Sequence, residues 1–223
     1  NKIIEMKNDI LKLSKGNEKN NLTICYGGVA PVPFILTAGH ILSNMQEIIV
    51  CDWDRFRKKW HFNTKFDDGS KIAMKLPNES DSSVDEICLV VSFSLNLNTK
   101  EIESKFPDLD VIEITFTDRV TEYERLSSLA MQQRVSKRII EFINQLIKIE
   151  YPNLSKINLF IGAQSSFIFQ LGSQLNQSHV PEIVCFHYSN EPKDQYYPWG
   201  ISIRSGPTEK YRLVEPDYKA LKS

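Results

Sequence analysis

The chain has 223 residues, 41% of them hydrophobic, and a formal net charge of −1, as in an ordinary globular protein of one large or two small domains. This near-neutral balance argues against a broad cationic face for duplex DNA, so we expect no direct DNA binding by this chain. No apolar run reaches the roughly 20 residues of a membrane span and no signal peptide is visible, which favours a cytoplasmic protein without a membrane partner.

The first segment, residues 1–20, carries isoleucines and leucines at loosely helical spacing. It is predicted to form a connector helix. Because residue 1 is asparagine rather than methionine, we expect the chain to be a piece of a longer protein with a domain upstream.

The four cysteines, Cys25, Cys51, Cys88 and Cys185, each lie in an apolar run, and no two of them form a CxxC pair. They are therefore expected to be buried strand thiols of a reduced protein. No histidine lies at metal-ligand spacing from another, so no metal site is predicted.

Two stretches of the chain, residues 22–54 and 157–188, share one plan of strand, small-residue loop, helix with a central glycine, and strand. The central glycines, Gly39 and Gly172, stand 133 positions apart. This pattern predicts a single βαβ unit that is used twice.

The intervening residues fit the same plan. Near-continuous apolar runs at 85–96 and 111–116 predict buried parallel strands, and residues 99–106 predict a short helix between them. Polar residues at 66–83 and the aromatic-bearing segment 190–200 are typical of loops.

The longest amphipathic pattern, at 121–150, predicts a helix at the start of the second half. We therefore predict an α/β fold of two fused Rossmann-like halves, each a largely parallel sheet flanked by helices. The connector at 1–20 precedes a first half at 21–120 and a second half at 121–223.

The absence of known catalytic and phosphate-binding motifs argues against an enzyme. There is neither a P-loop motif nor G-x-G-x-x-G, which leaves an NAD-binding Rossmann protein as a minor alternative. The stretch "GAQSS" at 162–166 lacks the second glycine of a nucleophile elbow, and the histidines are scattered, so no catalytic residues are predicted.

Two polar pairs at strand ends have two interpretations each. The hydroxyls of Ser165 and Ser166 either satisfy free N–H groups at a helix start or face a ligand phosphate there, and the two roles are compatible. Asp52 and Asp54 are expected to be a solvated strand end; a Mg²⁺ site is the less favoured alternative.

Aromatic residues follow the second strand of both copies. Trp53, Phe56 and Trp60 lie among basic residues in the first copy, and "DQYYPWG" at 194–200 holds the equivalent place in the second. Such rings stack on bases, and nearby cations neutralise phosphates. The alternative is that Trp60 and Trp199 fill the cores of their halves, as in a plain interaction scaffold.

The order of "YGGVAPVPFILTAGHIL", "EIIVCDWDRFRKKWHF", "EICLVVSFSLN", "INLFIGAQSSFIFQLG" and "PEIVCFHY…YYPWGI" resembles the SAVED family over roughly residues 20–204. SAVED domains resemble two fused CARF-type sensors and belong to bacterial antiphage (CBASS) effectors. The "DWDRFRKKW" and "YYPWG" pieces most resemble the subgroup in which SAVED follows an HNH endonuclease domain.

This resemblance implies a ligand-sensing domain, not an enzyme, that needs no cofactor and binds a cyclic oligonucleotide. In the HNH-linked subgroup a cGAMP-type cyclic dinucleotide is implied, and cyclic tri- or tetranucleotides in others; a ring nuclease is the enzymatic alternative. Binding would drive homo-oligomerisation and activate an attached HNH nuclease, whose motif is absent from these 223 residues and would lie upstream.

The resemblance also implies a ligand pocket built from strand-end loops and from the aromatic residues that flank them. The residues carried over are Tyr26, Gly27, Gly28 and Ala30 in the first strand-end loop, Ala163, Gln164, Ser165 and Ser166 in the second, Ser92 and Ser94 at a third strand end, and the flanking residues Trp53, Arg55, Phe56, Tyr196, Pro198 and Trp199.

Overall fold

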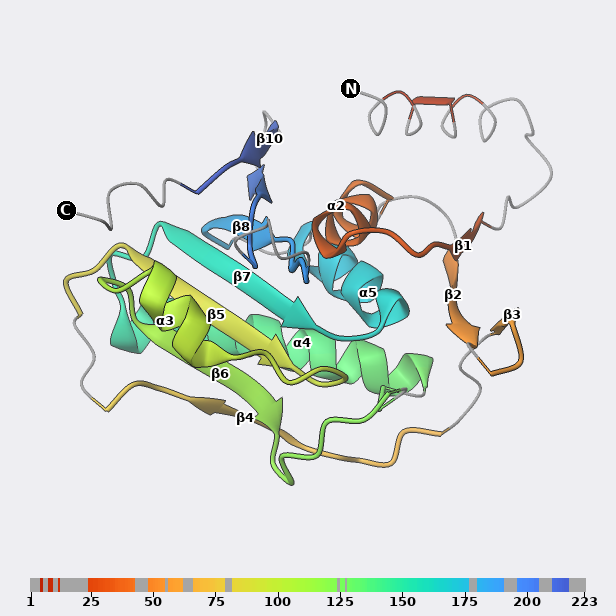
Figure 1. Ribbon diagram of the computed structural model, residues 1–223, viewed down its shortest axis with the longest axis horizontal. Coiled ribbons are helices and arrows are strands. Elements are labelled where there is room, and N and C mark those ends of the chain that lie inside the picture. Colours follow the sequence, from red (N-terminus) through yellow and green to blue (C-terminus); the bar gives the residue numbers. More distant parts are fainter. Residues whose placement is uncertain are drawn as a thin grey trace.

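A computed structural model describes residues 5, 8, 9, 12, 24–42, 48–54, 56–61, 66–78, 82–123, 125–126, 128–176, 180–190, 196–204 and 210–216 (Figure 1). The strands are β1 (Ile24–Gly27), β2 (Ile48–Asp54), β3 (Lys59–His61), β4 (Ile72–Lys75), β5 (Glu86–Ser92), β6 (Val111–Phe116), β7 (Lys156–Gly162), β8 (Glu182–Phe186), β9 (Gly200–Arg204) and β10 (Lys210–Val214). The helices are α2 (Val32–Leu42), α3 (Thr99–Lys105), α4 (Leu129–Gln145), a π-helical turn (Leu146–Glu150) and α5 (Ser165–Asn176). The predicted connector at 1–20 lies, apart from four residues, outside the described part of the chain.

The strands form two sheets. One has the order β1-β2-β3, and the other has the order β10-β9-β8-β7-β5-β6-β4. In the larger sheet β6, β5, β7 and β8 are parallel to one another. The edge strand β4 pairs antiparallel with β6, and β9 pairs antiparallel with β8 and with the other edge strand, β10. An α/β fold with helices beside the sheets is therefore confirmed. The strands divide between the sheets after β3 rather than near residue 120, so the predicted halves are not separate sheets, and their boundaries stay a prediction.

The predicted duplication is present in the structure. β1 pairs in parallel with β2 across α2, and β7 pairs in parallel with β8 across α5. The two helices lie side by side above α4 in Figure 1. Both copies therefore form the βαβ unit that the repeat predicted.

Side-chain alternation along the central strands builds two cores, one on each face of the larger sheet. Ile87, Leu89 and Val91 of β5 point into the core that α2, α4 and α5 share, whereas Cys88 and Val90 point to the opposite face. There they pack with Ile102 of α3, which covers the near face of the sheet in Figure 1. Every residue of β5 after Glu86 is buried, as expected for a central parallel strand.

Several elements differ from the sequence-based expectations. β4 lies within the segment predicted as a loop at 66–83; it is a four-residue edge strand that buries Ile72 while Ala73 and Lys75 stay exposed. The long helix begins at Leu129 rather than 121, because the Ser128 hydroxyl accepts the Met131 N–H and caps it there (3.0 Å). β3, β9 and β10 were not predicted.

The cysteine prediction holds for three of the four thiols. Cys51, Cys88 and Cys185 are buried, whereas Cys25 is exposed, because β1 is an edge strand of the smaller sheet. Among the described residues no group of three or more His, Cys, Asp or Glu side chains is placed to hold a metal ion. None of the described helices combines the length and the apolarity that crossing a membrane requires.

Candidate functional site

The carboxyl ends of strands from both sheets meet through one buried carboxylate. Asp52, near the end of β2, accepts hydrogen bonds from the backbone N–H of Ser166 (3.0 Å) and from its hydroxyl (2.5 Å). Ser166 lies in the first turn of α5, directly after the end of β7. In α/β proteins ligands bind outside the carboxyl ends of the strands, so this junction marks the region where a site is expected.

Asp52 belongs to a closed ring of hydrogen bonds. Gln164 donates to Asp52 (3.2 Å) and accepts the backbone N–H of Leu126 (2.8 Å). Gln132 of α4 closes the ring, because its side-chain amide donates both to the Leu126 carbonyl (2.9 Å) and to the Ser166 hydroxyl (2.8 Å). We call Asp52, Gln164, Leu126, Gln132 and Ser166 the Asp52 ring. All five residues are buried, so each polar group needs the partner it has here.

The Asp52 ring corrects one expectation and resolves another. Asp52 is 5% exposed, so its assignment to a solvated strand end was wrong. It takes the Ser166 N–H that was a candidate for a ligand phosphate, so this carboxylate occupies the first turn of α5. Asp54 caps the following turn by accepting the N–H groups of Phe56 and Arg57, and these bonds hold the pKa of its carboxyl below its usual value.

In the first predicted loop, Tyr26 to Ala30, Tyr26 contacts the second repeat, and Gly27, Val29 and Ala30 are exposed. The Tyr26 ring stacks on Phe169 of α5, with 4.7 Å between centroids, and burial raises the pKa of its hydroxyl. A Cβ on Gly27 would lie 3.2 Å from the Trp60 ring, and one on Gly28 would lie 2.7 Å from the Tyr26 hydroxyl.

The two predicted strand-end loops do not face each other. Gly39 of α2 lies against Phe169 of α5, and Gly172 of α5 lies against Leu36 of α2, so the helices are antiparallel. The start of α2 is therefore near the end of α5. The structure brings the start of α5 together with the end of β2 instead, and it leaves Ala30 at the other end of the helix pair from Ala163 and Ser165.

The flanking aromatic residues occupy matching positions in the two repeats. Trp53 is paired with Trp60 across the β2–β3 hairpin, with ring centroids 5.4 Å apart. His187 is the equivalent of Trp53, and its ring lies 4.8 Å from that of Trp199. Trp199 packs against the main core, whereas Trp60 is 41% exposed. Trp199 therefore helps to fill the core, as the alternative interpretation expected, whereas Trp60 does so less.

The remaining aromatic candidates are more exposed. Phe56 is 92% exposed in the β2–β3 turn, and Arg55 beside it lies outside the described residues. Tyr196 is 43% exposed with φ of +54°, stacked on Tyr188 at 6.2 Å, and Pro198 is half-buried. Tyr196 belongs to the α3 side of the sheet, where Lys105 lies 5.8 Å from the Tyr196 ring centre.

A hollow lies beside the third predicted strand end, the carboxyl end of β5. Ser92, at the end of β5, accepts the Leu97 N–H (3.3 Å), and Ser94 donates its backbone N–H to the Gly162 carbonyl (2.8 Å). Beside Ser92 lies a hollow of about 400 Å³, within the range of about 300–1,000 Å³ usual for ligand pockets. We call it the carboxyl-edge hollow; it is lined by Ala73, Lys75, Ser92, Asn96, Glu113, Thr115, Phe116, Thr117, Arg119 and Thr121.

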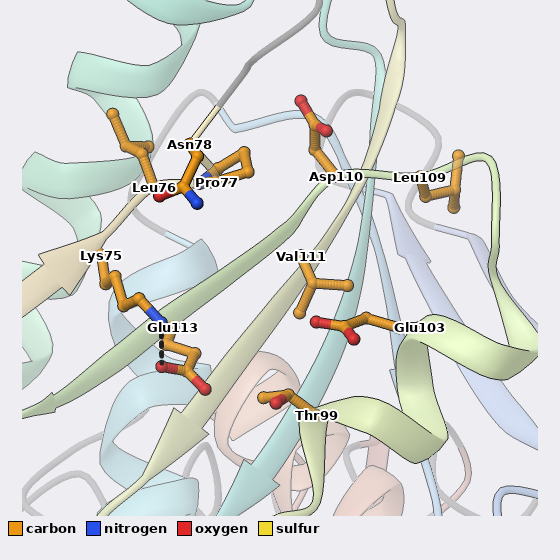
Figure 2. Close-up of a pocket in the computed structure, with 10 residues that line it drawn as sticks. All are labelled: Lys75, Leu76, Pro77, Asn78, Thr99, Glu103, Leu109, Asp110, Val111 and Glu113. Carbon is orange, nitrogen blue, oxygen red and sulfur yellow. Dashed lines mark ion pairs between the residues drawn. The ribbon is translucent and has the colours of Figure 1, made fainter.

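The lining of the carboxyl-edge hollow suits an anion. It carries the cations Lys75 and Arg119 against the single carboxylate of Glu113, together with the hydroxyls of Ser92 and three threonines. A neighbouring hollow of about 330 Å³ shares Lys75 and Glu113 but adds Glu103 and Asp110, which makes it acidic. Figure 2 shows the Lys75–Glu113 ion pair with Glu103 facing it from α3. The acidic hollow would repel a phosphate.

Sequence reasoning missed the segment of residues 117–123 and 125–126, which supplies Thr117, Arg119 and Thr121 to one wall of the carboxyl-edge hollow. Its Thr117 N–H donates to the Lys71 carbonyl (2.9 Å), and its Tyr123 hydroxyl donates to the Trp53 carbonyl (2.8 Å). Leu126 enters the Asp52 ring. Arg119 has φ of +57°, which is uncommon for a residue other than glycine. No motif marks these residues, although an arginine in a polar strand-end loop was a signal.

Structural comparison finds similar folds among receptors of one family. The Acinetobacter baumannii Cap4 SAVED/CARF-domain containing receptor with the cyclic trinucleotide 2′3′3′-cAAA gives a TM-score of 0.61 at 16% identity, over 88% of this chain and 40% of that one. The same receptor with 3′3′3′-cAAA gives 0.60 at 18% identity, over 88% and 41%. The Moraxella osloensis Cap4 receptor gives 0.52 at 15% identity, over 84% and 39%. The chain thus spans about two fifths of the length of these receptors.

The comparison with curated proteins found no match. In contrast, the family model described as SAVED, the SMODS-associated and fused to various effectors sensor domain, matches residues 6–203. This match covers most of the chain and agrees with the similarity in fold to the Cap4 SAVED/CARF receptors. The chain therefore belongs to the SAVED family of sensor domains.

Proposed function

We propose that this SAVED domain binds a cyclic oligonucleotide second messenger at the carboxyl edge of its parallel strands and does not cleave it. The observation that carries the proposal is the carboxyl-edge hollow, where two cations and several hydroxyls line the strand ends against one carboxylate. A cyclic oligonucleotide has few negative charges, so a chain of net charge −1 needs only such a local set of donors.

The hollow of about 400 Å³ holds part of such a ligand rather than all of it. The Tyr123–Trp53 hydrogen bond joins the wall of the hollow to the β2–β3 hairpin. On this hairpin the exposed aromatic side chains of Phe56 and Trp60 offer faces on which a base can stack. The ligand-binding set carried over from the sequence keeps its place in the proposal. Within that set, Gln164 and Ser166 act by holding the strand ends, and Ser92 acts from the hollow.

The ring size separates two versions of the proposal. The resemblance to the HNH-linked subgroup favours a cGAMP-type cyclic dinucleotide. The Acinetobacter baumannii Cap4 receptor, which has a similar fold, holds cyclic trinucleotides, and this favours the larger ring. In both versions, binding drives homo-oligomerisation in the cytoplasm and activates an effector nuclease fused to this domain in the longer protein.

Thermal unfolding with a panel of cyclic di-, tri- and tetranucleotides tests the proposal. A ligand that binds the native state alone, at 100 times its Kd, stabilises it by about 2.7 kcal/mol, so a matching ring raises Tm by several degrees. Linear mononucleotides and NAD give no such shift. Chromatography of the incubated ligand then separates a sensor, which returns the ring intact, from a ring nuclease. A panel without any shift contradicts the proposal.

A further inference from the structure

We propose that Arg119 is the residue that binds a phosphate of the ligand, and that the Asp52 ring positions it. This assignment rests on the proposed function and adds to it the contact that recognises the ligand's charge. Arg119 lines the carboxyl-edge hollow together with Asn96 and Thr121, which are neutral donors. A guanidinium and hydroxyls together are the donor set that phosphate oxygens require.

Arg125, the other arginine of this segment, has its guanidinium bound within the protein, whereas Arg119 is available to bind a ligand. Arg125 donates to Asp118 and to the Ser70 hydroxyl (3.2 Å), and its guanidinium lies 4.6 Å from the centre of the Phe116 ring. It is therefore held inside the fold. Arg119, in contrast, has an exposed side chain, and no carboxylate of the described residues forms an ion pair with it.

The backbone around Arg119 is fixed in an unusual conformation. Its φ of +57° is held by the Arg119 N–H, which donates to the Phe116 carbonyl (2.9 Å), and by the Val120 N–H, which donates to Asp118 (3.0 Å). Strained residues of this kind persist where surrounding structure fixes them, and they gather at ligand-binding sites. Here the conformation places the side chain at the hollow.

The Asp52 ring holds the far end of the same wall. The Leu126 N–H donates to the side-chain oxygen of Gln164, and Gln164 is oriented by its own donation to Asp52. A change at Gln164 therefore shifts the segment that carries Arg119 without touching the hollow itself. Gln164 and Asp52 are positioning residues in this assignment.

The first experiment measures ligand affinity by calorimetry for Arg119→Ala, with the matching cyclic oligonucleotide from the panel as the probe. Loss of one charged hydrogen-bonding partner should weaken binding about 10- to 100-fold while Tm without ligand stays unchanged. Arg119→Lys should recover part of the loss. Arg138→Ala is the matched control, because Arg138 is an exposed arginine on α4 that pairs with Glu141; it should bind as the wild type does.

The second experiment tests positioning with a charge exchange. Gln164→Glu replaces the donor that faces Asp52 with an acceptor, so affinity should fall; adding Asp52→Asn returns a donor and should restore it. In the Arg119→Ala background, Gln164→Glu should weaken binding no further, because its effect passes through Arg119. A purely structural role would instead lower affinity by the same factor in both backgrounds.

The outcomes separate the two proposals. If the wild-type chain binds no cyclic oligonucleotide, the proposed function falls and the assignment falls with it. If the wild type binds and Arg119→Ala binds equally well, the assignment alone is overturned. If Arg119→Ala weakens binding but Gln164→Glu acts additively, the positioning part is overturned.

Discussion

Gly39 and Gly172 each press against the backbone of the other's helix. A Cβ on Gly39 would lie 2.0 Å from the Phe169 carbonyl oxygen, and a Cβ on Gly172 would lie 2.1 Å from the Leu36 carbonyl oxygen. Phe169 follows Leu36 by 133 positions, the same interval that separates the two glycines. The contact is therefore reciprocal, as in an interface with twofold symmetry, although both partners belong to one chain.

Gly39→Ala and Gly172→Ala should both destabilise the fold. Each methyl group would meet a backbone oxygen that cannot move alone, so α2 and α5 must separate, at a cost of about 1–3 kcal/mol despite the better helix propensity of alanine. Urea unfolding measures this loss. Gln133→Ala, at an exposed position of α4, is the control and should change little. Equal stability of the glycine variants and the control would mean that the helices do not meet as described.

Loss of the Asp52 carboxylate should also destabilise the chain. Asp52→Ala leaves the Ser166 N–H and hydroxyl and the Gln164 amide without their buried acceptor, which costs about 1–3 kcal/mol for each unsatisfied group, in part relieved by water. Asp54→Ala loses two backbone caps and the ion pair with Arg57 in an exposed turn, and it should cost less. Chemical denaturation of both variants compares them; a larger loss at Asp54 would contradict the Asp52 ring.

The ion pair of Asp67 and Arg134 gives stability a pH dependence. Hydrogen bonds of 2.6 and 2.7 Å from Arg134 lower the pKa of Asp67 from 3.8 to about 2. A carboxyl whose pKa is lower in the folded state stabilises that state above its unfolded pKa and loses this contribution as pH falls through the folded one. Both side chains are partly exposed, so the contribution is about 1 kcal/mol.

This contribution should disappear between about pH 4 and pH 2. Asp67→Asn should therefore be less stable than the wild type at pH 6, and the two free energies of unfolding should converge toward pH 2. Unfolding in urea at a series of pH values provides the measurement. A constant difference across the series would show that the ion pair does not form.

Trp199 and Phe56 should have different roles, the first in stability and the second in ligand binding. Trp199 packs on the core beside Phe34, with 5.4 Å between ring centroids, so Trp199→Ala should cost about 3 kcal/mol or more of stability. Phe56 is 92% exposed, so Phe56→Ala should leave stability within about 0.5 kcal/mol. If Phe56 stacks on a base, the same variant should weaken ligand binding. Unfolding and calorimetry on both variants test the division.

The duplicated unit could be predicted because it is local. Each copy keeps its strand, helix and glycine within about thirty residues, so periodicity and spacing reveal it without any knowledge of the fold. The glycine pair at 39 and 172 was visible in the sequence, and the structure supplies its reason. β4 escaped detection because a short edge strand buries few side chains, so its alternation is weak among polar neighbours.

The Asp52 ring could not be predicted in the same way. Asp52 and Ser166 are 114 positions apart, and no pattern in either segment indicates the other. Strand-end reasoning placed Gln164 and Ser166 in a ligand-binding loop, and it could not tell that the Asp52 carboxylate of the other repeat accepts their hydrogen bonds. Arg119 could not be predicted either, because the hollow that it lines forms only when residues from several strands pack together.

Isothermal titration of the chain with purified cyclic oligonucleotides of two, three and four nucleotides, each beside its linear counterpart, tests the sensor function most directly. We predict that one ring binds with saturable heat, that its linear form does not, and that the ring is recovered unchanged. Absence of saturable heat from every ring, with a chain shown to be folded by its cooperative unfolding, would contradict the proposed function.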